Sequence, residues 1–365
     1  MSFFYSIFPT MIVLGVLIVI HEFGHFLACR LFKVRVEKFS IGFGPEILHW
    51  QGKETRYTIS LFPLGGFVKP AGESISEVDS KEGLKPGDYL AASLGARIFI
   101  VSAGVIMNYI LAFFLFSFLF MMGRPVPGTV IGGFVKGYPA ETSGLMKKDK
   151  IVEVNGKKVQ TFFDLTRALD ASPQDAAKLT IERSGELLPI EINLKSEEVK
   201  DPFGTSIRVK RLGISPYPAS AIFERYSLQV SLKHAAQTVI QLAVNTYRAL
   251  FLVATGKMSF KSMSGPIGII SMTGDAARMG LPYVLQLMAT LSVSLAVINL
   301  LPIPALDGGH LMFLLVEAFR RKTVSLEVQD KATQVGFALL LALMVFIIYN
   351  DVVNLDVIAR IKHLF

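Results

Sequence analysis

Four long apolar stretches dominate the hydropathy pattern of this 365-residue chain. A helix needs roughly 20 residues, at 1.5 Å each, to cross a hydrocarbon core about 30 Å thick. The apolar stretches approach or exceed that length, and segments of ordinary soluble character separate them. The pattern therefore predicts transmembrane helices at Ile7–Leu31, Ile98–Met122, Val284–Leu301 and Ala332–Tyr349.

Composition supports a membrane protein with water-facing modules. Apolar residues make up 52% of the chain and charged residues 18%, and the mean hydropathy is +0.49. The net charge of +8 comes from residues spread beside the apolar stretches. This distribution indicates charges facing an anionic leaflet and no nucleic-acid partner. Cys29 is the only cysteine, which excludes a disulfide within the chain and a cysteine-based zinc site.

The distribution of lysine and arginine predicts the orientation of the spans. Residues 1–20 contain neither, whereas basic residues follow the first span and lie between the third and fourth. Loops rich in these residues face the cytoplasm. We therefore expect the termini and the long segment between the second and third spans on the outer side. The basic residues concerned are Arg30, Lys33, Arg35, Lys38, Arg320, Arg321 and Lys322.

Residues 123–198 read as one inserted α/β domain. Short β-type runs surround a helical stretch at 163–171, and Asn155-Gly156 and Ser184-Gly185 are typical hairpin turns. Its motifs resemble PDZ domains of bacterial proteases, which bind an extended peptide or a C-terminus at a sheet edge. A small β-rich spacer without a ligand is the alternative. The motifs are Tyr138-Pro139-Ala140, Ser143-Gly144-Leu145, Asp149-Lys150-Ile151 and Val154-Asn155-Gly156.

Two other segments lie between the spans. Residues 32–97 contain short strand-like runs with glycine turns, which predict a membrane-associated β-hairpin region whose free edge could hold an unwound substrate. A surface hairpin without a substrate role is equally compatible. Residues 199–282 predict an amphipathic helix on the outer leaflet within 216–262, carrying Ile222, Tyr226 and Val230, and a linker. A core helix of the soluble domain is the alternative.

The first span contains the ionisable sequence HEFGH at residues 21–25, an HExxH motif. Side chains four residues apart share one helix face, so His21 and His25 can reach one zinc ion with Glu22 beside it. Zinc lowers the pKa of a bound water to about 7, and the glutamate takes its proton as the water attacks a carbonyl. Each intramembrane charge costs about 2.5 kcal/mol or more. Three in one span therefore indicate function, the alternative being paired structural groups.

A catalytic zinc takes a third protein ligand and leaves its fourth position for water. The best candidate is Asp307, within the sequence NLLPIPALDGGH at residues 299–310. Two prolines and two glycines break the helix there, and the freed backbone must line a cavity or be buried in protein. The orientation rule places this break on the same cytoplasmic side as the histidines. Glu46 and Glu317 are weaker candidates, and His310 fits a supporting or helix-capping role better than a ligand.

The paired motifs HEFGH and NLLPIPALDGGH, on the first and third spans, resemble the site-2 protease family of intramembrane zinc metalloproteases. The similarity extends over most of the chain through SIGFGP, FPLGGFVK, SAGVIMN and SGPIGI. It is greatest to the bacterial regulator-of-sigma-E protease branch. In two respects the chain differs from that branch. Val105 replaces a proline of the second-span motif, and one PDZ-like domain fits in the insert where the best-studied relatives have two.

The resemblance implies roles for individual residues. His21, His25 and Asp307 would bind one Zn²⁺ per chain, and Glu22 would be the general base. Asn299 would hold the substrate backbone near the metal, while Asn108 and His310 would support the ligands. A membrane-associated substrate hairpin would contain Gly42, Phe43, Gly44, Gly65 and Gly66.

The resemblance also implies a biological setting. The fold would be a multi-pass α-helical membrane protein of a bacterial cytoplasmic (inner) membrane, with the active site toward the cytoplasm and the PDZ-like domain on the periplasmic or extracellular side. The substrates would be single-span membrane proteins, such as anti-sigma factors after a first cut, and remnant signal peptides. Such regulated intramembrane proteolysis serves the envelope stress response.

Two functions other than proteolysis are alternatives for this sequence. One is a catalytically silent scaffold that binds single-span proteins through the PDZ-like domain, and the other is a zinc transporter. An intact HExxH argues against the scaffold, and spans two and four lack the acidic or histidine sites that a transporter would need.

The expected organisation of the chain alternates spans and inserts. The expected segments are 1–31 (first span), 32–97 (β region), 98–122 (second span), 123–198 (PDZ-like domain), 199–282 (amphipathic helix and linker), 283–319 (third span with LDGGH) and 320–365 (fourth span and tail).

Overall fold

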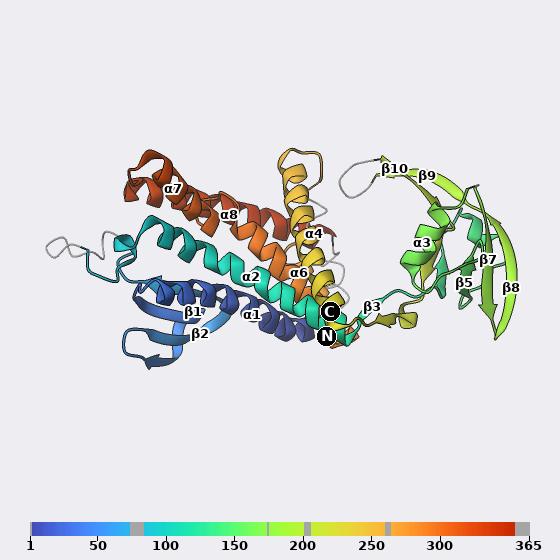
Figure 1. The fold of residues 1–365 in the computed structure, drawn as a ribbon, viewed down its shortest axis with the longest axis horizontal. Helices are drawn as coiled ribbons and strands as arrows, with labels where there is room; N and C mark the ends of the chain where they lie inside the picture. Colours follow the sequence, from blue (N-terminus) through green and yellow to red (C-terminus); the bar gives the residue numbers. More distant parts are fainter. Residues whose placement is uncertain (1, 74–83, 174, 201–205, 260–263, 355–365) are drawn as a thin grey trace. The chain divides into compact units, whose positions relative to one another are not determined.

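Four helices are long and apolar enough to cross a membrane. The computed structural model describes residues 2–73, 84–173, 175–200, 206–259 and 264–354 (Figure 1). A candidate span occurs at each of the four predicted places, so the prediction of a multi-pass helical membrane protein is confirmed. The candidate spans are Tyr5–Leu31, Leu94–Met122, Leu281–Asn299 and Glu327–Val353.

The chain divides into two units. A helical unit comprises Met1–Phe118, Ser231–Val253 and Ser259–Phe365, and a β-rich unit comprises Leu119–Val230 and Ala254–Met258. The β-rich unit is inserted between the second and third spans, as expected for the soluble insert. It continues well beyond residue 198, where the sequence pattern placed the end of the inserted domain.

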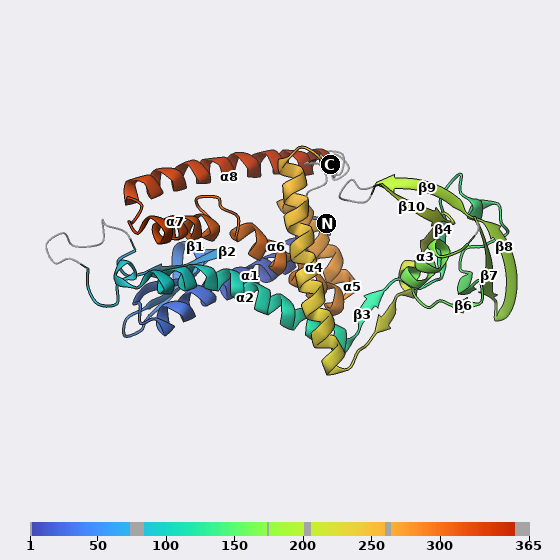
Figure 2. The same cartoon turned by 45° about the horizontal axis from the view of Figure 1, so that its top comes forward.

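Helices α1 (Ser2–Leu31) and α2 (Leu94–Met122) lie side by side (Figures 1 and 2). Their closest approach involves Gly24 of the HExxH motif. A Cβ atom at Gly24 would lie 2.4 Å from the carbonyl oxygen of Ala103 on α2. Only glycine permits this backbone separation, which places α2 directly against the chemical motif of α1.

The third span ends in a break before a separate short helix. Helix α6 (Leu281–Asn299) stops, and α7 (Asp307–Arg320) begins after seven irregular residues. Prolines in the break cannot donate helical hydrogen bonds, and Ala305 has a φ of +92°. The candidate span Leu281–Asn299 lies close to the predicted Val284–Leu301, and the break predicted after it separates this helix from the short helix that carries Asp307.

Helix α8 (Leu326–Asn354) forms the fourth span, and α5 (Pro266–Met279) packs against it. The buried carboxylate of Asp351 on α8 accepts hydrogen bonds from the first amides of α5, at Gly265 (2.9 Å), Ile267 (3.0 Å) and Gly268 (3.1 Å). These amides have no intrahelical partner, so the carboxylate satisfies them and the positive end of the helix dipole. The sequence pattern gave only a linker where α5 lies.

Helix α4 (Leu228–Ala254) occupies the region predicted to be amphipathic, but it starts later. Ile222 lies in the short strand β12 (Ile222–Glu224) instead, and Tyr226 precedes the helix. The predicted start is wrong because β12 pairs with β3 (Arg124–Val126). This tertiary strand pairing overrides the local helical spacing of the apolar residues.

Two long, bent strands beside α1 form the predicted hairpin sheet: β1 (Val36–Gln51) and β2 (Arg56–Pro70). Residues 38–41 of β1 align with residues 56–59 of β2 on one side and with 66–69 on the other. The segment 66–70 is therefore an edge of this sheet, and β2 contacts α1. An edge strand has backbone groups free to pair with another chain or side chain.

The β-rich unit is built around a four-stranded sheet of order β6-β5-β7-β8 with helix α3 (Phe162–Asp170). Both predicted hairpin turns are present, with positive φ at Asn155-Gly156 and Ser184-Gly185. Fourteen buried residues, including Leu212 beyond the predicted domain end, form its core. The strands of the unit not yet given are β4 (Ile131–Phe134), β5 (Lys150–Val154), β6 (Lys157–Lys158), β7 (Ala176–Arg183), β8 (Glu186–Asn193), β9 (Lys195–Lys200), β10 (Ser206–Arg211) and β11 (Ile214–Pro216).

Candidate metal centre

Three predicted metal ligands meet at one point inside the helical unit. His21 and His25 lie one turn apart on α1, and Asp307 is the first residue of α7. His21 Nε2 lies 3.3 Å from His25 Nε2. Asp307 Oδ2 lies 3.1 Å from His21 Nε2 and 3.5 Å from His25 Nε2. Three potential ligand atoms thus form a nearly equilateral triangle.

The size of this triangle fits zinc. Ligand atoms about 2.0–2.1 Å from a tetrahedral Zn²⁺ lie roughly 3.4 Å apart, so the three atoms match one face of the tetrahedron. The Asp307 Oδ2 atom is buried, and no hydrogen-bond partner for it is found in the described part of the chain. Two imidazoles and a carboxylate, with a vertex left for water, are the donor set of a catalytic zinc site.

Gly104 of α2 leaves the space that the metal needs. A Cβ atom at this position would lie 2.3 Å from His25 Nε2 and 2.8 Å from His21 Nε2. Both distances are shorter than a real Cβ atom tolerates, so the space beside the two nitrogens exists only because this residue is glycine. Glycine therefore keeps this side of the cluster open. The sequence contained a signal for this role, because Gly104 is a small residue within the second-span motif SAGVIMN.

Glu22 lies between the cluster and the edge of the hairpin sheet. Its Oε2 atom accepts a hydrogen bond of 3.1 Å from the backbone amide of Val68. A Cβ at Gly66 would lie 3.4 Å from Glu22 Cγ, so the absent side chain leaves room for the glutamate. The carboxylate next to the ligands is thereby tied to the edge segment 66–70. The sequence pattern predicted Glu22 at the site but not its hydrogen bond with the Val68 amide.

Comparison with known proteins gives the family. The sequence profile of Peptidase family M50 matches residues 9–343. A provisionally named zinc metalloprotease of Agrobacterium fabrum is 34% identical over 361 residues, covering 96% of both chains. Proteins with the same provisional name from Campylobacter jejuni and Rickettsia conorii are each 36% identical, covering 96% of this chain and 94% and 99% of their own. The chain belongs to Peptidase family M50.

This membership confirms the resemblance to site-2 proteases and makes the chain a zinc metalloprotease. In this M50 chain, helix α2 holds both imidazole rings in place through contacts to their Nδ1 atoms. His25 Nδ1 lies 2.8 Å from the carbonyl oxygen of Ile100, which is an acceptor only. His25 Nδ1 therefore carries the proton, and its Nε2 lone pair is available to a metal.

Asn108 supports His21 in the same way. Its side-chain amide is fully buried and lies 3.2 Å from His21 Nδ1, while no partner is found for its Oδ1 atom within the described residues. If the Asn108 side-chain amide is rotated by half a turn, its Oδ1 accepts a hydrogen bond from a protonated His21 Nδ1. The structure allows this rotation, because the oxygen and nitrogen of a side-chain amide are assigned from hydrogen bonding alone. The Asn108 carbonyl in turn accepts a hydrogen bond of 2.8 Å from Ser292 of α6.

The remaining predicted residues differ in their distance from the centre. Asn299, the last residue of α6, has its amide nitrogen 3.5 Å from His21 Nε2 and so borders the cluster. His310 is exposed, and within the described residues no hydrogen bond joins its ring to the ligand atoms. Glu46 lies in the hairpin, where hydrogen bonds from Lys38 and Arg56 lower its pKa to about 2.

Glycines shape the part of the hairpin near the edge segment. Gly42 and Gly44 have φ of +91° and +89°, a region that favours glycine. Phe43 between them places its ring directly over Gly65, where a Cβ would lie 1.8 Å from it. The same ring stacks on Phe67. The structure therefore brings together all five hairpin residues that the resemblance singled out.

Replacing Gly104 with alanine should abolish zinc binding, because the methyl group would lie against both Nε2 atoms. We expect purified wild-type protein to contain one zinc per chain and Gly104→Ala to contain less than a tenth of that, measured by mass spectrometry of the metal. Gly95→Ala is the matched control, because a Cβ at Gly95 of the same helix meets nothing within 4 Å. Full zinc content in Gly104→Ala would contradict this geometry.

Proposed function

We propose that this M50 metalloprotease hydrolyses peptide bonds within the transmembrane segments of single-span membrane proteins. The observation that carries the proposal is a ligand triangle in which both histidines lie inside a candidate span. His21 and His25 belong to Tyr5–Leu31, a helix of 27 residues with a hydropathy of 2.0. A hydrolytic centre at this position acts on bonds at membrane depth or near the interface, where soluble proteases have no access.

The residues of the centre have distinct roles in this proposal. His21, His25 and Asp307 hold the zinc, which when bound supplies a Lewis acid that polarises the scissile carbonyl and acidifies water. Glu22 is the general base that takes the proton of the attacking water and passes it to the leaving amine. Asn299 donates a side-chain hydrogen bond to the substrate backbone beside the ligands.

Substrate recognition requires local unwinding. All amides inside a transmembrane helix are hydrogen-bonded, so a peptide bond becomes accessible only when a few residues leave the helix. The edge segment 66–70 can pair with such an extended stretch, as sheet edges do in peptide recognition. On this open side of the sheet the Val68 amide donates to Glu22, which puts the edge segment next to the proposed general base. Gly65 and Gly66 present no side chains that would obstruct a second strand.

The proposed setting follows the family resemblance and the basic residues after the first span. Arg30 in the last turn of α1 and Lys33 just after it support a cytoplasmic position for this end of the helix in a bacterial inner membrane. The proposed substrates are anti-sigma factors already shortened by another protease and remnant signal peptides. Their cleavage would serve an envelope stress response. A zinc transporter is less compatible, because the described residues contain one cluster of possible metal ligands.

The role of Glu22 predicts that Glu22→Gln keeps its zinc but loses activity. Removing a general base typically lowers kcat about 10²- to 10⁴-fold. The measurement is cleavage of a tagged single-span substrate by purified enzyme, alongside zinc content. A substrate with a Gly-Pro pair in its apolar segment should be cut faster than its parent.

The matched control for this substitution is Glu186→Gln at the exposed β7–β8 turn, which should cleave like wild type. Addition of a zinc chelator should stop cleavage in wild type and control alike. Unchanged cleavage by Glu22→Gln would remove the glutamate from the mechanism.

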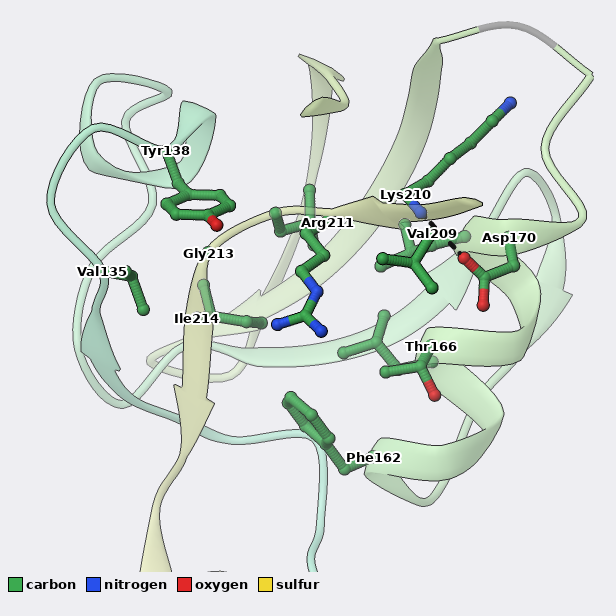
Figure 3. Close-up of a pocket in the computed structure, with 13 residues that line it drawn as sticks. Val135, Tyr138, Phe162, Thr166, Asp170, Val209, Lys210, Arg211, Gly213 and Ile214 are labelled. Atoms are coloured by element: carbon green, nitrogen blue, oxygen red, sulfur yellow. Dashed lines mark hydrogen bonds between the residues drawn. The ribbon is translucent and has the colours of Figure 1, made fainter. Parts of the chain in front are cut away.

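We also infer that the β-rich unit is a PDZ-like domain that binds a peptide C-terminus. A cavity of about 380 Å³ lies between α3 and the stretch from Val209 to Ile214 (Figure 3). Leu165 and Leu169 of α3 give it an apolar wall. Figure 3 shows the Arg211 side chain projecting into this space, and its Nε lies 3.3 Å from Glu197 Oε1. In the proposal, the terminal nitrogens of the guanidinium bind the carboxylate of the peptide. In the proposal, this groove selects substrates that already have a new C-terminus.

Charge reversal at the groove should weaken binding of a carboxylate. We expect Arg211→Glu in the full-length protein to bind a fluorescent peptide that ends in valine with a free carboxylate at least fivefold more weakly, measured by anisotropy. Arg208→Glu, an exposed position on the same strand, is the matched control. Equal affinity for the free and the amidated peptide in wild type would contradict carboxylate recognition.

A further inference from the structure

A buried ion pair joins the two helices that meet near the metal centre, away from the centre itself. Arg97 of α2 donates to both carboxylate oxygens of Glu317 on α7, at 2.5 and 3.2 Å. The side chains are only 9% and 14% exposed. By contrast, the pair formed by Arg30 and Glu54 is 40% and 50% exposed. Bidentate geometry fixes the orientation of both partners, not only their separation.

The pair lies at a defined distance from the third metal ligand. Glu317 follows Asp307 by ten residues on one straight helix, which corresponds to about 15 Å at 1.5 Å per residue. Arg97 lies on the same helix as Ile100 and Asn108, which hold the two histidines. Helix α2 therefore contacts the rings of His21 and His25 directly. It is joined to the third ligand, Asp307, indirectly through the ion pair with α7.

Helix α7 needs such a contact because the chain before it is irregular. In the break after α6, turn-type backbone hydrogen bonds, such as that from the Leu306 amide to the Ile303 carbonyl (3.0 Å), replace the continuous helical ladder. Among the described residues, the ion pairs of α7 with α1 and α2 are those of Asp307 with the histidines and of Glu317 with Arg97. Neither Arg97 nor Glu317 belongs to the cluster of metal ligands.

The pair is also poorly optimised for stability. Burying two charges costs desolvation energy that their attraction barely offsets, and apolar residues of similar size often stabilise a protein as much. Arg97 Nε is buried, and the described residues offer it no hydrogen-bond partner. A buried ion pair of this kind contributes orientation more than it contributes stability.

We propose that Arg97 and Glu317 are positioning residues that hold α7 so that Asp307 completes the zinc site. This inference rests on the proposed role of Asp307 as the third ligand. Metal sites tolerate ligand displacements of only about 0.5 Å. Without the pair, α7 is free to tilt about its irregular connection, and the site retains two histidines and a displaced carboxylate.

The test is the zinc affinity of the full-length protein in detergent, measured by competition with a chromophoric chelator. We expect Arg97→Met and Glu317→Gln each to weaken zinc binding at least tenfold. The exchanged pair, Arg97→Glu with Glu317→Arg, should recover most of the affinity, which a general packing defect would not allow. Arg30→Met is the matched control, because that exposed pair contributes little.

A double-mutant cycle with Asp307→Ala separates positioning from general damage to the fold. In the Asp307→Ala background, Arg97→Met should change zinc affinity by less than twofold, since α7 no longer supplies a ligand. A tenfold effect in both backgrounds would overturn the proposal, as would wild-type affinity in Arg97→Met. If Asp307→Ala alone left zinc affinity unchanged, the ligand assignment of the proposed function would fail instead. Should Arg97→Met not fold, Glu317→Gln replaces it in the cycle.

Discussion

The structure depends on how ionisable side chains are satisfied inside apolar helices. His21, Glu22 and His25 interrupt a span that is otherwise apolar, and lipid offers them no hydrogen bonds. Each has a partner within the protein instead: a carbonyl or amide of α2, a strand amide, or the carboxylate of Asp307. The arrangement leaves three lone pairs directed at one point, which is what a metal ion requires.

Small residues make this arrangement sterically possible. Gly24 allows α1 and α2 to approach, Gly104 leaves the metal position open, and Gly66 admits the glutamate. In addition, Gly308 at the start of α7 lies so close to the preceding break that a Cβ would be 2.1 Å from the Leu301 carbonyl oxygen. The chemistry of the centre thus relies on backbone packing that larger residues would prevent. Helix α2, which carries no predicted ligand, takes part in the contacts of Gly24 and Gly104.

The sequence predicted the four spans, the hairpin and the residues of the metal cluster, because membrane length, HExxH spacing and proline-glycine breaks are local signals. It did not predict features that depend on distant partners. The Val68 amide near Glu22 and the Arg97–Glu317 pair join residues far apart in the chain. Likewise, β12 formed where helical spacing predicted a helix, because it pairs with β3. The sequence pattern did not predict this pairing, since β3 lies about a hundred residues earlier in the chain.

The most direct test of the zinc site is anomalous diffraction at the zinc absorption edge from crystals of the full-length protein. We expect one zinc peak per chain, about 2.0–2.2 Å from Nε2 of His21, Nε2 of His25 and a carboxylate oxygen of Asp307. Solvent or an inhibitor should occupy the fourth position. A zinc ion bound elsewhere, or bound by the two histidines with Asp307 outside the coordination sphere, would contradict the account.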